Sequence, residues 1–368
     1  MIDDLLRDLT IAPVMGRFHP LVTLCLPPGT DVRPKARSIA VEMDDRKAEA
    51  VRPVLITEPD QAYADRFITR SLTELPDVDR INAGLPLRLD AARSLLTNKR
   101  VAGRIAEDAL RRGYRAVFLL LIDGLGYEDT RHWPEAPEPV FIDGPSITFF
   151  RTDDGRILPD VGFPAIVGTP PLAQRLLRLG LSRARGYSYW ERQSNDVAAV
   201  MFDGMPLERV GGMDEALGRL ANESLDGLYV QMVRIGTDGL AHGRREVSPR
   251  EVASTVAAVR EDMLQVVEML RGSGVPGAVY LTSDHGILWK RQHALRESGA
   301  HRSGHPRYSA APLGDGAPVT RMVADEAEFL LYHYPFLGAA IRSNNSGVHG
   351  GLSCWESIVP FVHIEVNL

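Results

Sequence analysis

The stretch Ala116-Val-Phe-Leu-Leu-Leu-Ile122, followed at once by Asp123-Gly124-Leu125-Gly126, decides the fold of this 368-residue chain. Consecutive apolar residues of this length are typical of a strand that is buried on both faces, as the strands of a parallel sheet are. The glycines that follow mark a turn where the strand ends. The stretch therefore predicts a central strand of a covered sheet, with Asp123 at its carboxyl end.

Outward from this strand, apolar runs alternate with helical patterns. Further strands are expected at Pro139–Ile142, Val197–Phe202, Leu228–Ile235, Gly277–Thr282 and Ile358–Val366. Helices are expected at Leu89–Arg112, Pro171–Gly180, Met213–Glu223 and Pro249–Arg271. Strands that alternate with helices predict an α/β fold with a mostly parallel central sheet and helices on both faces.

Residues 1–112 carry no recognisable chemistry. Short strands are expected at Leu21–Leu26 and Val51–Thr57, with a weaker third at Ser38–Met43, between proline-bearing loops. We therefore expect two units: an N-terminal α+β segment of unknown role over residues 1–112, and a larger α/β domain over residues 113–368.

Composition and charge exclude several classes of protein. The chain has 42 Lys+Arg against 48 Asp+Glu and 44% hydrophobic residues, which is typical of a globular protein without general attraction to nucleic acid. Cys25 and Cys354 are too few for a disulfide framework. The N-terminus lacks the apolar core of a signal peptide, and the longest apolar run is too short to span a bilayer. We expect a cytoplasmic protein that does not associate with membranes.

Aspartate and histidine residues follow several of the expected strands or precede the last one. In open α/β sheets the functional site lies beyond the carboxyl ends of the strands, so these side chains are expected to converge there. The six residues are Asp123, Asp238, His242, Asp284, His285 and His349.

Imidazole nitrogen and carboxylate oxygen together suit Zn²⁺, and carboxylates also suit Mn²⁺ or Mg²⁺. Asp238 and His242 are four residues apart, which would place both on one face of a helical turn. Six ligands are too many for one tetrahedral ion but suit two ions with three protein ligands each. Two such ions could clamp the attacking and leaving oxygens of a phosphoryl transfer. We predict two divalent cations, with Zn²⁺ as the expected ion and Mn²⁺ or Mg²⁺ as alternatives.

These residues, in this order, resemble the pattern of the alkaline phosphatase superfamily. The closing stretch His349-Gly-Gly-Leu-Ser353-x-x-Glu356-x-x-Val359-Pro360 is similar to the end of PglZ domains, in the phosphodiesterase branch of that superfamily. The resemblance covers about residues 115–368. It implies an alkaline phosphatase-like fold. It also implies that Asp238, His242 and His349 hold one cation, and that Asp123, Asp284 and His285 hold the other.

The resemblance further implies a Ser or Thr nucleophile that forms a covalent phosphoryl intermediate. Thr169 is our predicted nucleophile, because it precedes a proline-started helical run, as the family's nucleophile precedes a helix. Thr148 is the alternative: Pro145-Ser-Ile-Thr148 matches the family's Pro-Ser-x-Thr wording better, but no helix is expected directly after it.

The 63 residues between His285 and His349 are rich in Arg and His. A connection of this length is uncommon without a role, and cations beside a phosphoryl-transfer site would bind substrate phosphates. We predict that Arg302 and Arg307 contact the substrate, and that Tyr187 stacks on a nucleobase.

The leading functional hypothesis is a metal-dependent phosphodiesterase, of the nuclease type, that acts on nucleotide or oligonucleotide substrates. A phosphomonoesterase or a phosphosugar mutase would share the same ligands. A third alternative follows from the PglZ resemblance: a component of a phage-defence assembly, with the N-terminal segment docking a protein partner. The sequence does not indicate the oligomeric state.

Overall fold

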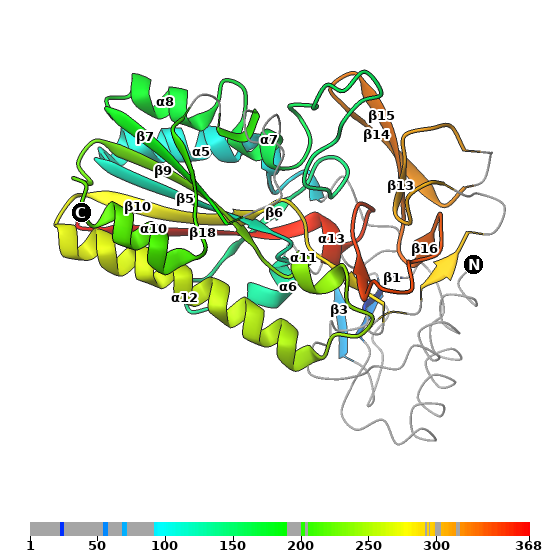
Figure 1. Cartoon of the computed structure of the whole chain (residues 1–368). Coiled ribbons are helices and arrows are strands. Elements are labelled where there is room, and N and C mark those ends of the chain that lie inside the picture. Colours follow the sequence, from blue (N-terminus) through cyan, green and yellow to red (C-terminus); the bar gives the residue numbers. More distant parts are fainter. Residues whose placement is uncertain are drawn as a thin grey trace.

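The computed structural model describes residues 92–189, 200–202, 205–290, 293, 295–298, 303–313 and 317–368, together with the backbone of three short N-terminal strands. At its centre lies an eight-stranded sheet in the order β4-β6-β18-β10-β5-β9-β7-β8 (Figure 1). Its strands are β4 (Leu96–Thr97), β5 (Ala116–Asp123), β6 (Glu138–Phe141), β7 (Arg183–Ser188), β8 (Leu207–Arg209), β9 (Leu228–Ile235), β10 (Gly277–Ser283) and β18 (Ile358–Val366). Only β18 runs antiparallel to its neighbours, which confirms the mostly parallel sheet.

Both faces of the sheet are covered by helices. Every residue of β5 is buried, and alternate side chains enter different hydrophobic clusters. Leu120 packs on the side of α10 (Met213–Leu220) and α12 (Pro249–Ser273). Leu119 packs on the opposite face of the sheet, which is covered by α5 (Asn98–Arg112), α7 (Phe163–Val167) and α8 (Leu172–Arg178). The central strand is thus held by apolar burial on two sides.

The longest helix, α12, has a sequence-coded start and end. The Ser248 hydroxyl accepts a hydrogen bond from the Glu251 amide, and the Glu251 carboxylate accepts one from the Ser248 amide. This capping box satisfies two amides that the first helical turn leaves free. Pro249 occupies the first helical position, and Gly274 ends the helix in the left-handed conformation.

The segment between the cluster residues His285 and His349 forms small sheets beside the carboxyl edge of the main sheet (Figure 1). It was expected as one long connection. Its strands are β11 (Leu288–Trp289), β12 (Arg296–Glu297), β13 (Tyr308–Ser309), β14 (Val319–Ala324), β15 (Ala327–Tyr332), β16 (Phe336–Leu337) and β17 (Gly347–Val348). They pair as β11-β17, β12-β16 and β13-β15-β14, and so fold the long connection back onto itself.

The apolar runs locate most strands of the main sheet to within one or two residues. The expected strand at Val197–Phe202 is wrong over residues 200–202, which are helical, and its earlier residues lie outside the described chain. β7 lies beside β9 instead. Its sequence, Arg-Ala-Arg-Gly-Tyr-Ser, contains no apolar run, so this strand was not predicted. Polar side chains are tolerated there because the first three residues of β7 are only half-buried.

Upstream, β1 (Thr23–Cys25), β2 (Val54–Thr57) and β3 (Ile68–Ser71) form a separate parallel sheet. β1 and β2 fall within expected strands, β3 was not expected, and Ser38–Met43 lies outside the described residues. β4 and α5 precede residue 113 but pack into the main unit.

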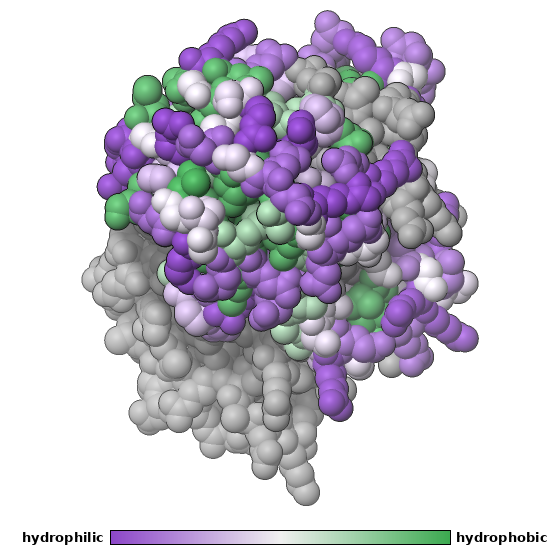
Figure 2. Space-filling view, turned by 60° about the vertical axis from the view of Figure 1, so that its left-hand side comes forward, coloured by the Kyte–Doolittle hydropathy of each residue, from purple (hydrophilic) through white to green (hydrophobic). Residues whose placement is uncertain are grey.

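No helix among the described residues is long and apolar enough to cross a membrane. The face of the molecule in Figure 2 is mostly hydrophilic, with small scattered apolar patches. Exposed apolar side chains of this kind, such as Leu110 on α5 and Leu177 on α8, are ordinary on a folded protein.

Candidate metal centre and active site

The main sheet brings all six predicted site residues together at its carboxyl edge. Asp123 is the last residue of β5, and Asp284 and His285 directly follow the neighbouring strand β10. Asp238 begins α11 (Asp238–Ala241) after β9, and His242 directly follows this helix. Parallel strands end at the same edge, and this geometry explains why residues so distant in sequence meet.

Two local features bring these loops into contact. β11, just after His285, pairs with β17, just before His349, and the two imidazole rings stack with centroids 3.8 Å apart. On the other side, Gly124 has a φ of +77°, and a Cβ there would lie 2.7 Å from the amide nitrogen of Asp238. Only glycine permits this close approach of the β5 and β9 loops.

Asp238, His242 and His349 form the first group, whose candidate ligand atoms all lie within 4.8 Å of one another. Oδ1 of Asp238 lies 3.2 Å from Nε2 of His242 and 3.4 Å from Nε2 of His349. The two Nε2 atoms are 3.1 Å apart. Two imidazole nitrogens and a carboxylate oxygen thus face a common point.

Asp123, Asp284 and His285 form the second group, which is fully buried and has the same spread of ligand atoms. Nε2 of His285 lies 3.4 Å from Oδ1 of Asp123 and 3.6 Å from Oδ2 of Asp284. The remaining oxygen of Asp284, Oδ1, accepts hydrogen bonds from the amides of Gly124 and His285. One oxygen of Asp284 is thereby held by the backbone while the other faces the site.

The outer nitrogen of each imidazole is occupied. Nδ1 of His285 lies 3.1 Å from the carbonyl of Gly286, and Nδ1 of His349 lies 2.9 Å from the carbonyl of Ser146. Nδ1 of His242 lies 2.9 Å from the side-chain amide of Asn345. Contacts of this kind fix the ring orientation of metal-binding histidines. All three Nε2 atoms therefore point inward.

The charges of the cluster call for a cation. Burial and the neighbouring Asp238 and Asp284 carboxylates raise the pKa of Asp123 to about 7. Burial also raises the pKa of Asp284. Oδ1 of Asp238 and Oδ2 of Asp284 are buried without a well-aligned hydrogen bond. Because buried carboxylate oxygens are paired or bind cations, the donor set of both groups fits divalent cations such as Zn²⁺.

The structure brings Thr148, not Thr169, to this cluster. Oγ1 of Thr148 lies 3.4 Å from Oδ1 of Asp123 and 3.4 Å from Nε2 of His285. Thr169 is exposed beyond the C-terminal end of α7, and its carbonyl accepts a hydrogen bond from Arg175. It makes no contact with the six residues, all of which are described. A helix that was not predicted lies beside Thr148: α7 follows Gly162, and the amide of Phe163 donates to the Thr148 carbonyl.

Two of the three predicted substrate contacts, Arg307 and Tyr187, do not reach the site. Arg307 is fully buried, and its guanidinium donates to Glu356 and to backbone carbonyls. Tyr187 is fully buried in the hydrophobic cluster on the α12 side of the sheet. A buried ion pair and a buried ring are not available to contact a substrate, so the predictions for Arg307 and Tyr187 are wrong. Arg302 lies outside the described residues.

The groups that orient the histidines carry no recognisable signal in the sequence. Asn345 lies in a polar run, Ser343-Asn-Asn-Ser346, that reads as a plain loop, so no pattern singled it out. Ser146 contributes only its backbone carbonyl to His349, which no residue type can signal. Contacts of this kind depend on tertiary packing rather than on local sequence.

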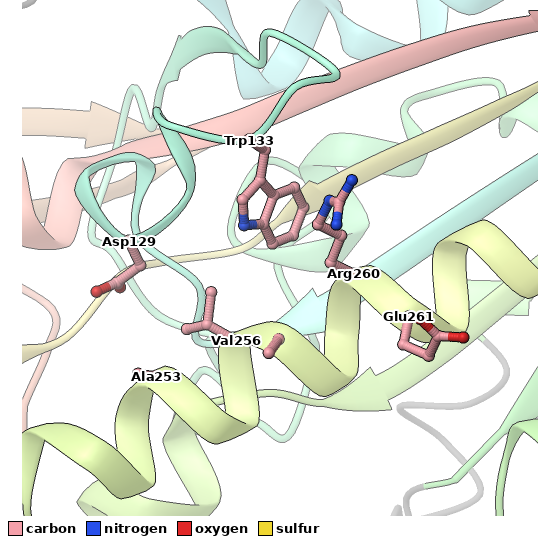
Figure 3. Close-up of a pocket in the computed structure, with 7 residues that line it drawn as sticks. Asp129, Trp133, Ala253, Val256, Arg260 and Glu261 are labelled. Atoms are coloured by element: carbon pink, nitrogen blue, oxygen red, sulfur yellow. The ribbon is translucent and has the colours of Figure 1, made fainter.

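A pocket of about 450 Å³ lies elsewhere, between α12 and the turn after α6 (Tyr127–Thr130) (Figure 3). Trp133 and Arg260 line it, together with Asp129. Two of its polar groups have partners within the chain: Arg260 binds Glu135, and the Asp129 carboxylate accepts from the Gly126 amide. None of the six site residues lines this pocket.

No protein-family model matches this chain, and no curated protein matches it in sequence. Among solved structures, an inactive form of murine ectonucleotide pyrophosphatase/phosphodiesterase 5 in complex with AMP is similar over 67% of this chain and 87% of its own, at 12% identity and a TM-score of 0.43. The human protein gives the same coverage and TM-score at 10% identity. The C-terminal periplasmic domain of phosphoethanolamine transferase EptC from Campylobacter jejuni matches over 68% and 80%, at 8% identity and a TM-score of 0.38.

Proposed function

We propose that this chain is a metal-dependent phosphoester hydrolase of the alkaline phosphatase type, with Thr148 as its nucleophile. One observation carries the proposal: three imidazoles with occupied Nδ1 atoms turn Nε2 toward three carboxylates, and the Thr148 hydroxyl lies among them. Such an arrangement is expected of two adjacent cation sites with an activated hydroxyl beside one of them.

The first group would hold one divalent cation, and the second group would hold the other. When bound, the cations supply Lewis acidity, which lowers the pKa of a nearby hydroxyl and neutralises charge that develops on phosphoryl oxygens. The second group is the one that contacts Thr148. The three residues of this group are buried and Thr148 is half-buried, so electrostatic interactions between them are stronger than in bulk water.

Asp123 and His285 position the Thr148 hydroxyl from two sides. Oγ1 attacks phosphorus, and the bond from phosphorus to the leaving alkoxide breaks as the new P–O bond forms. The threonine proton leaves with the alcohol or passes to water. Water then attacks the phosphothreonine, which restores the hydroxyl and releases the phosphorylated product.

We propose a phosphodiester rather than a monoester as the substrate. A monoester dianion carries one more negative charge than a diester, and enzymes commonly bind it with Arg or Lys. Arg307, which the sequence predicted as a phosphate ligand, is committed to Glu356 instead. The choice of nucleotide or oligonucleotide diesters rests on the resemblance of the closing stretch His349–Pro360 to PglZ domains.

Turnover of bis-p-nitrophenyl phosphate and p-nitrophenyl phosphate by the purified chain, with added Zn²⁺, Mn²⁺ or Mg²⁺, tests the proposal. We expect the diester to be hydrolysed faster, and Asp284→Ala to abolish turnover. Asp226→Ala is the matched control, because this exposed aspartate pairs with Arg115 near the opposite edge of the sheet. If neither substrate is turned over with any of the cations, the chain is not a phosphoester hydrolase. If the monoester is turned over faster, the proposed preference for diesters is wrong.

A further inference from the structure

Arg307 and Glu356 form an ion pair in which neither side chain is exposed. Nε and Nη2 of Arg307 donate to the two carboxylate oxygens at 2.9 and 2.8 Å, which is the bidentate geometry that arginine makes with carboxylates. Arg307 lies next to β13, in the long connection, and Glu356 lies in α13 (Cys354–Ser357), just before β18. The pair thus joins the small sheets to the main sheet.

The same carboxylate holds the loop that follows His349. The amide of Gly351 donates to Oε1 of Glu356 at 3.1 Å, and the hydroxyl of Ser353 donates to Oε2 at 2.5 Å. A Cβ on Gly351 would lie 2.6 Å from the Arg307 guanidinium, so this loop lies directly against the pair. The first residue of this loop that contacts the pair, Gly351, lies two residues after His349.

The pair is also tied to the other parts of the site. The amide of Gly286, next to His285, donates to the backbone carbonyl of Glu356 at 2.9 Å. Arg307 uses its remaining donors on the carbonyls of Tyr332, His333 and Phe336, which anchor it to the end of β15 and to β16. The side chains of the pair therefore join the His349 loop to the small sheets, and the backbone of Glu356 holds the His285 loop beside them.

A buried ion pair is weak evidence for stability, because removing two charges from water costs about as much as their attraction returns. The contacts of this pair point to positioning instead. We propose that Arg307 and Glu356 are positioning residues that hold His349 within reach of Asp238 and His242, and so set the affinity of the first group for a divalent cation. This inference rests on the proposed function, because it requires that the first group binds a cation.

The test measures Zn²⁺ affinity by competition with a chromogenic chelator, and the thermal unfolding midpoint of the chelated protein. Glu356→Gln keeps the shape of the side chain and removes its charge. We expect it to weaken one of two bound Zn²⁺ ions by about 10- to 100-fold, the usual effect of losing a group that orients a ligand, and to leave the other ion bound as before. Ser353→Ala removes a single contact to Glu356, and we expect it to weaken the same ion several-fold without unfolding the chain.

The matched control is Glu135→Gln. It breaks the other bidentate arginine–glutamate pair described above, between Glu135 and Arg260 on α12, away from the cluster. It should change the unfolding midpoint and neither Zn²⁺ affinity. If Glu356→Gln and Ser353→Ala lower the midpoint while both affinities stay at the wild-type values, the pair is merely structural and the inference is wrong. If the wild-type protein binds none of Zn²⁺, Mn²⁺ and Mg²⁺, the proposed function itself fails.

Discussion

At the scale of single residues, the site depends on contacts that fix the orientation of its three imidazole rings. His242, His285 and His349 each use Nδ1 on a neighbour, which leaves Nε2 for the cluster. The sequence predicts which six residues gather at the cluster because Asp and His at strand ends are an unusual pattern. It predicts neither the ring orientation nor which of the two candidate threonines lies beside the cluster, because both depend on loops that meet only in the folded chain.

Thr148→Ala should lower diester turnover by about 10³-fold or more, because the hydroxyl that attacks phosphorus is removed. Thr148→Ser keeps a hydroxyl in the same place and should retain a substantial part of the activity. Steady-state kinetics with a saturating cation measures both effects. Mass spectrometry of acid-quenched enzyme should find the phosphoryl group on the peptide that contains Thr148.

Thr169→Ala is the control for the nucleophile, since this exposed residue has no contact with the cluster. Its activity should equal that of the wild type. A large loss with Thr169→Ala and none with Thr148→Ala would return the nucleophile to the position that the sequence pattern favoured.

Asn345→Ala should weaken cation binding at the first group by about 10- to 100-fold, because the His242 ring loses the partner of its Nδ1 atom. The second group shares no contact with Asn345 and should keep its affinity. Zn²⁺ titration against a competing chelator measures both sites. Equal affinities in the variant and the wild type would show that Asn345 does not orient His242.

At the scale of elements, the apolar runs predict β5, β9, β10 and β18 because these strands are buried on both faces. β7 was missed because its half-buried arginines break the apolar pattern. The small sheets from β11 to β17 were also missed, since several of these strands have only two residues. Short strands are held by their pairing partners, and a single strand's sequence carries little of that information.

The pair of Arg260 on α12 with Glu135 gives a pH prediction at this scale. The hydrogen bonds from Arg260 hold the pKa of Glu135 below its usual value of 4.5, against the opposing effect of burial. Because this pKa is lower in the folded than in the unfolded chain, the carboxylate stabilises the fold at pH values above its pKa in the unfolded chain. The stabilisation is lost as the pH falls through its pKa in the folded chain.

Glu135→Gln should therefore lower the free energy of unfolding by about 0.5–1 kcal/mol near neutral pH, a modest value because Arg260 is partly exposed. The difference from wild type should shrink as the pH is lowered below the usual pKa of the carboxylate. Urea unfolding at a series of pH values measures it. A difference that grows toward acid pH would contradict the assigned pairing.

At the scale of the whole molecule, the fold places a cluster of acidic and imidazole groups in a chain whose net charge is −6. Bound cations would make that edge attractive to a phosphate despite the negative total. Five of the six residues end or follow strands of the main sheet, and their convergence was predictable because parallel strands end at one edge. His349 follows β17 and reaches the cluster through the pairing of β17 with β11. The chain's own substrate contacts were not predictable in this way, since Arg307 and Tyr187 turned out to be interior residues.

Each of the two groups should bind one divalent cation, and the number of Zn²⁺ ions bound per chain measures this. After loading and desalting, elemental analysis by mass spectrometry should find two ions on the wild type. It should find one on His242→Ala, which breaks only the first group, and none on the double variant His242→Ala/Asp284→Ala. Two ions retained on that double variant, or none on the wild type, would contradict the account.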